Sequence, residues 1–75
     1  MTFHELECVV LTRDLPEHSL REGDLGAVVH VAGTDLEVEF VTADGGTLAL
    51  VTLPGSAVRR VEATDLVSVR RLRSA

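Results

Sequence analysis

The sequence predicts an all-β fold, a small antiparallel barrel of five to six short strands formed by a single domain over residues 1–75. Turn-forming residues recur at short intervals, which leaves no window for a long amphipathic helix. The apolar share is 45% and the aromatic share is only 3%, so the core must consist mainly of Val and Leu. A core rich in β-branched residues favours strands.

The first strand is expected from about Leu6 to Thr12, where an apolar, β-branched run occurs. A long polar loop from Arg13 to Asp24 follows it. We expect Leu15 and Leu20 to point inward and anchor this loop. A long first loop is typical of the SH3-like barrel.

The second strand is expected over 25–32, and its alternate residues predict an inward face of Leu25, Ala27, Val29 and Val31. The third strand, over 36–42, has the clearest alternation in the chain. Leu36, Val38 and Phe40 occupy one side, and Glu37 and Glu39 the other. This pattern is typical of a half-buried antiparallel strand.

Asp44, Gly45 and Gly46 supply the residues of a tight hairpin turn, after which a fourth strand is expected over 47–53. Pro54 and Gly55 end that strand, and Ser56 and Ala57 form a short turn. A fifth strand over 58–61 and a sixth over 66–72 complete the prediction. The predicted core includes Val10, Val29, Val31, Val38, Phe40 and Val51, with Phe40 as its largest member.

The charge balance argues against nucleic acid as the partner. Twelve acidic residues and seven arginines, with no lysine, give a net charge of -5, which would repel phosphates. The balance is uneven along the chain. Residues 1–45 carry two arginines and ten acids (2 − 10 = −8), and residues 46–75 carry five arginines and two acids (5 − 2 = +3).

Candidate ligands and nucleophiles are few. His4, Cys8, His18 and His30 lack the paired spacing of a structural zinc site, so we expect no metal and no cofactor. Cys8 lies in an apolar run and is expected to be buried as a small hydrophobe. The serines lack a glycine-flanked elbow, and so short a chain has little room for a catalytic cleft. The sequence therefore predicts a protein that is not an enzyme.

The cysteine content and the first residues indicate the cellular location that we expect. The single cysteine, Cys8, cannot form an internal disulfide, and the first residues lack the basic start and apolar run of a secretory signal. No apolar run approaches the roughly 18 residues of a membrane helix. We expect a cytoplasmic protein without a membrane partner.

Arginine is concentrated near the C-terminus. We expect Arg59, Arg60, Arg70 and Arg71 to form the partner-binding site, because a guanidinium can hold a carboxylate by two parallel hydrogen bonds. Two other interpretations remain open. The arginines could form a solvated strand face, or they could pair within the barrel with acids such as Glu37 and Glu39.

Three segments together resemble a known family: residues 9–18 (VVLTRDLPEH), residues 23–31 (GDLGAVVHV) and residues 37–41 (EVEFV). The chain is similar in these segments, and in residues 66–70 (LVSVR), to the bacterial domain of unknown function family 4926. The resemblance extends over nearly the whole chain and implies a small SH3-like protein. It implies no catalytic or ligand-binding residue.

These observations favour a non-catalytic protein-interaction module. It would self-associate as a homodimer or act as the small partner of a larger bacterial protein, for example by neutralising a toxin. The reason is that so small a barrel cannot bury all of its Val and Leu, and an exposed apolar patch is typical of an interaction surface. The alternative is a nucleic-acid or ribosome-associated module that uses the C-terminal arginines.

Overall fold

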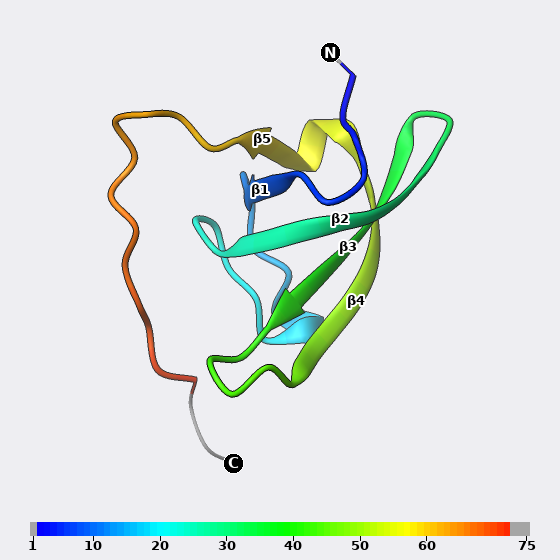
Figure 1. Ribbon diagram of the computed structural model, residues 1–75. Helices are drawn as coiled ribbons and strands as arrows, with labels where there is room; N and C mark the ends of the chain where they lie inside the picture. The colour runs from blue at the N-terminus through cyan, green and yellow to red at the C-terminus, as the bar shows by residue number, and fades with distance from the viewer. Residues whose placement is uncertain (1, 73–75) are drawn as a thin grey trace.

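The protein forms one antiparallel sheet of five strands in a computed structural model that describes residues 2–72 (Figure 1). The strand order is β4-β3-β2-β1-β5. The elements are β1 (Cys8–Leu11), η1 (Pro16–His18), β2 (Leu25–Ala32), β3 (Asp35–Val41), β4 (Thr47–Pro54), η2 (Gly55–Ala57) and β5 (Val58–Arg60), where η marks a single 3-10 turn. The all-β class and the antiparallel pairing are therefore confirmed.

The outer strands of this sheet are β4 and β5, and no ladder joins them among the described residues. The sheet is consequently curved but not closed into a barrel by backbone hydrogen bonds. The chain passes directly from one outer strand to the other through η2, which follows the expected break at Pro54. Both edges of the sheet remain available for further pairing.

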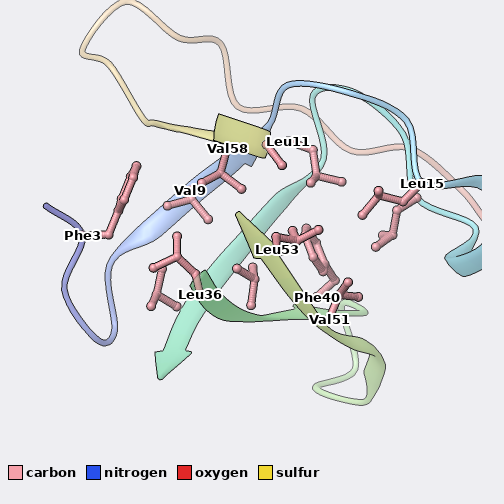
Figure 2. Packing of buried hydrophobic residues seen from close by; sticks show 13 residues of the cluster. Phe3, Val9, Leu11, Leu15, Leu36, Phe40, Val51, Leu53 and Val58 are labelled. Carbon is pink, nitrogen blue, oxygen red and sulfur yellow. The ribbon is translucent and has the colours of Figure 1, made fainter. Parts of the chain in front are cut away.

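The core lies on the concave side of the sheet, where side chains from all five strands converge (Figure 2). Phe40 is only 2% exposed and is the more buried of the two phenylalanines, as predicted. Val38 and Leu36 share its side of β3, while Glu37 and Glu39 lie on the other side. The alternation of β3 is thus confirmed.

The long first loop is anchored as predicted. Leu15 and Leu20 are both buried, and they form an isolated antiparallel bridge that closes the loop on itself. The turn η1 lies between them, and Ser19 ends it in the left-handed conformation. The loop is therefore a compact unit packed against the core.

The inward face of β2 differs from the prediction because the strand contains a bulge. Val28 pairs with Val38 and His30 pairs with Glu37, so Val29 is an extra residue without a partner. The extra residue reverses the side on which the following residues lie. Val28 is fully buried, Val29 is only half-buried, and Val31 returns to the edge of the core.

In β1 the inward positions belong to Val9 and Leu11, which are almost fully buried. Val10 is buried, as predicted, although it lies on the opposite face of the strand and outside the main cluster. Cys8 is exposed, which corrects the expectation of a buried thiol. The exposure of Cys8 follows from the alternation of a short strand, because the neighbouring Val9 takes the inward position.

The predicted sixth strand over 66–72 is absent from the described structure. Strand β5 ends at Arg60, and the Asp65 N–H donates to the Glu62 carbonyl oxygen (3.0 Å) to form a turn. The chain then runs in an extended course without a neighbouring strand (Figure 1, orange to red). We call residues 61–72 the strap. A segment with a strand-forming sequence becomes a strand only when it lies beside the edge of another strand. Residues 66–72 have no such neighbour among the described residues.

Candidate functional site

Arg59 fastens the beginning of the strap to the sheet. Its Nη1 and Nη2 atoms donate to the two carboxylate oxygens of Asp65, at 2.9 and 3.0 Å. The Arg59 guanidinium and the Glu62 backbone N–H lower the pKa of the Asp65 carboxyl to about 2. This two-pronged pair is the geometry in which arginine holds a carboxylate best.

Arg70 fastens the far end of the strap. Its Nε donates to one Asp24 carboxylate oxygen at 2.7 Å, its Nη2 donates to the other at 2.5 Å, and Nη2 also donates to the Ser19 carbonyl oxygen. The Arg70 guanidinium holds the pKa of the Asp24 carboxyl below its ordinary value. Both side chains are largely shielded from solvent, so this contact is less screened than a surface pair.

Arg60 is engaged on another part of the sheet. Its Nε donates to a Glu7 carboxylate oxygen at 2.5 Å, and its guanidinium lies over the Phe3 ring, 4.6 Å from the centroid. It also donates to the Thr2 carbonyl oxygen. The His4 backbone N–H, followed by Arg60, lowers the pKa of the Glu7 carboxyl. Arg60 therefore covers the rim of the core beside the N-terminal segment.

The four predicted partner-binding residues do not gather in one cluster. Arg59 and Arg60 are neighbours in β5 and contact different segments, and Arg70 lies at the other end of the strap. Arg71 is exposed and makes no hydrogen bond or ion pair with the described residues. Glu37 and Glu39 pair with none of these arginines within residues 2–72.

Between the strap and the sheet lies a hollow of about 810 Å³. Exposed apolar side chains gather around it. Six of the eight large ones exposed in the described structure line this hollow, namely Leu25, Val41, Val61, Leu66, Val67 and Val69. Leu66 and Val69 are at least 90% exposed. Single apolar side chains scattered over a surface are normal, whereas a contiguous apolar patch is typical of an interaction site. The six residues around the hollow form such a patch.

The polar groups around the hollow are largely engaged with one another. Asp24 and Asp65 are each held by an arginine, and the pKa of each carboxyl is lowered. A carboxylate in this state is a poor proton acceptor at neutral pH. Within residues 2–72 no three His, Cys, Asp or Glu side chains come together to hold a metal ion. No helix among these residues is long and apolar enough to cross a membrane.

Sequence reasoning did not identify the acids that hold the strap. Asp24 and Arg70 are 46 positions apart, and no local pattern links them. Asp65 was also missed, although it lies only six residues after Arg59, in the short polar turn from Glu62 to Asp65, where a local pattern could have indicated it. The exposure of the apolar residues of the strap was not predicted, because their sequence is typical of a buried strand.

The comparisons with known proteins bear on the sheet and not on the strap. Searches of curated proteins and of solved structures each return no match. A family model, described as "Domain of unknown function (DUF4926)", matches residues 5–60. This range contains all five strands and ends where β5 ends, so the expected likeness over residues 66–70 lies outside it. Because the match covers most of the chain, the protein belongs to the DUF4926 family.

Proposed function

We propose that this protein is a non-catalytic protein-interaction module whose binding surface is the strap together with the hollow beneath it. The observation that carries the proposal is the gathering of six exposed apolar side chains around one hollow. It would self-associate or serve as the small partner of a larger bacterial protein, including the toxin-neutralising case. We place it in the cytoplasm, since its one cysteine, Cys8, cannot form an internal disulfide.

The charge distribution supports a protein partner over a nucleic acid. Three of the four arginines predicted to bind a partner already hold carboxylates of this chain, and the molecule is acidic overall. Phosphate binding would require several free cations on one surface. Arg71, which has no described partner, is suited to a single carboxylate on another protein. Arg59 and Arg70 contribute by holding the strap, whereas Arg60 holds the N-terminal segment on another part of the sheet.

The chemistry of the hollow supports the proposal that the protein is not an enzyme. Its two carboxylates, Asp24 and Asp65, are held by Arg70 and Arg59, so they offer no free base beside a nucleophile. Exposed Cys8 stands outside the hollow lining. The surface is therefore suited to contact and not to a reaction.

The proposal can be tested by protein capture. The wild-type protein and the variants Val69→Asp and Arg71→Gln would be immobilised and exposed to lysate of the native host. We expect a stoichiometric protein partner, a second copy included, that is lost with Val69→Asp and weakened with Arg71→Gln. Leu6→Asp is the matched control, because Leu6 is 85% exposed and stands outside the hollow lining. Tight, salt-sensitive retention of DNA or RNA by wild type at physiological salt would favour the nucleic-acid alternative.

A further inference from the structure

The two edges of the sheet differ in how well they are protected. Strand β5 is three residues long and contains Arg59 and Arg60, and short, charged edges resist pairing. Strand β4 is eight residues long and contains no charged residue (TLALVTLP). No described strand pairs with its outer side. An edge of this kind presents a row of free N–H and C=O groups to any added strand.

The strap contains the complementary element. Residues 66–72 (LVSVRRL) have a strand-forming sequence, yet they make no backbone–backbone hydrogen bond with the described residues. Val67 and Val69 fall on one side of an extended chain, with Arg71 following them at the same spacing. An unpaired strand-forming segment and an unpaired strand edge thus occur in one molecule.

The outward face of β4 matches that side of the strap. Leu50 is 57% exposed and lies beside Glu39 of β3, and exposed Thr52 lies beside Glu37. If Val69 lies against Leu50, Arg71 is two residues further along, where its long side chain faces the row of Glu37 and Glu39. Arg71 is the cation on this side of the strap, and Glu37 and Glu39 are the acids beside Thr52 and Leu50, so the charges of the two surfaces are opposite.

We propose that the strap of one copy adds as a strand to the β4 edge of a second copy, and that the two copies exchange straps in a closed two-fold dimer. This inference rests on the proposed function and names its partner. A second copy fits because each chain supplies both one donor segment and one acceptor edge, so a reciprocal exchange closes after two subunits. Main-chain hydrogen bonds supply the register, and the Val69–Leu50 contact covers two exposed apolar side chains.

Disulfide trapping tests the contact directly. In a Cys8→Ser background, which removes the exposed native thiol, one sample would carry Leu50→Cys and the other Val69→Cys. We expect a disulfide-linked dimer when the two samples are mixed under mild oxidation, and little cross-linking in either sample alone. Efficient cross-linking of Leu50→Cys with itself would show direct β4–β4 pairing and overturn the proposal. The absence of any cross-link would overturn it as well.

Sedimentation equilibrium of the wild type and its variants tests the energetics. We expect Val69→Asp to raise the dimer dissociation constant about tenfold or more, since a factor of ten needs only about 1.4 kcal/mol. Leu6→Asp should leave it unchanged. Arg71→Glu and Glu39→Arg should each weaken the dimer, and the double variant should recover most of the loss. Circular dichroism would verify that each variant remains folded.

The outcomes separate this inference from the proposed function. If the wild type stays monomeric at about 100 µM, far above the dissociation constant of a specific dimer, strap exchange is excluded. If that monomer also binds another protein, and Val69→Asp abolishes the binding, the strap is still an interaction surface and only the identity of its partner was wrong. If nothing but nucleic acid is captured, both proposals fail.

Discussion

At the scale of single residues, Gly26 shows a constraint that backbone angles do not reveal. A Cβ atom at this position would lie 2.6 Å from Val38 Cγ1 and 2.8 Å from Phe40 Cε1. Both neighbours are buried in the core and have little room to move. Gly26 therefore leaves room for the side chains of Val38 and Phe40 against β2, whereas Gly23, with φ of +94°, is the glycine that the preceding bend requires.

Gly26→Ala should destabilise the protein by about 1–3 kcal/mol, the range for overpacking a well-filled core. Urea unfolding would measure the change. Gly55→Ala is the matched control, because its added Cβ would meet its nearest neighbour at an ordinary 3.7 Å and its φ is not positive. A similar loss in both variants would show that the contacts with Val38 and Phe40 are not responsible, because the lower chain entropy of alanine by itself favours the folded state.

Phe40→Ala should cost about 3–5 kcal/mol of unfolding free energy, through lost transfer energy and the cavity left behind. This is a large share of the stability of a small domain. Val41→Ala, at the exposed neighbouring position, should change stability by less than about 0.5 kcal/mol. A loss below about 1 kcal/mol for Phe40→Ala would mean that the side chain is not packed as described here.

At the scale of elements, the strap differs from every other segment in how it is held. The strands are joined by ladders, and the first loop is closed by its own bridge. The strap instead has an arginine–aspartate pair at each end, and its middle lies exposed. Its attachment depends on ionised carboxylates far more than that of the sheet does.

Acidification should release the strap before the sheet unfolds. The pKa values of Asp24 and Asp65 are both below the ordinary 3.8, so their contribution is complete above that value and is lost as the pH falls towards about 2. Amide NMR shifts of residues 66–69 should therefore change between about pH 4 and pH 2, ahead of those of β3. In the double variant Asp24→Asn, Asp65→Asn, the amide shifts of residues 66–69 at neutral pH should match those of the wild type at low pH. A strap that keeps its shifts in that variant would show that the two pairs do not hold it.

At the scale of the whole molecule, the open sheet leaves apolar surface uncovered. The concave side is filled by the core cluster, and the large exposed apolar residues of the described chain, except Leu6, lie around the hollow or on the outer face of β4. A short chain has too little polar surface to avoid such a patch except by association. The uncharged β4 edge is the reason why we propose strand pairing as the mode of association.

Association should be visible as a dependence of stability on concentration. Because only folded chains form the dimer, the urea concentration at the unfolding midpoint should rise as the protein concentration is raised from about 1 to 100 µM. Light scattering at the upper concentration should give twice the mass of one chain. The Val69→Asp variant should show a midpoint independent of concentration. A wild-type midpoint that does not move would contradict self-association over this range.

The sequence by itself determined the features that depend on neighbours along the chain. The alternation of β3, the hairpin at Gly45 and the break at Pro54 are written in spacing and turn chemistry, and all three occur where they were predicted. The inward anchors Leu15 and Leu20 follow from the same local logic, because isolated leucines in a polar loop gain most by burial.

Only the tertiary structure decided the features that depend on segments far apart in the chain. The bulge at Val29 reverses a face that strict alternation assigns wrongly, and it is visible only from the pairing of β2 with β3. Whether residues 66–72 form a strand depends on an edge being beside them, which no sequence pattern records. The Arg70–Asp24 pair joins segments 46 positions apart. Strand periodicity is a local property, whereas strand pairing and ion pairing are set by which distant segments the folded chain brings together.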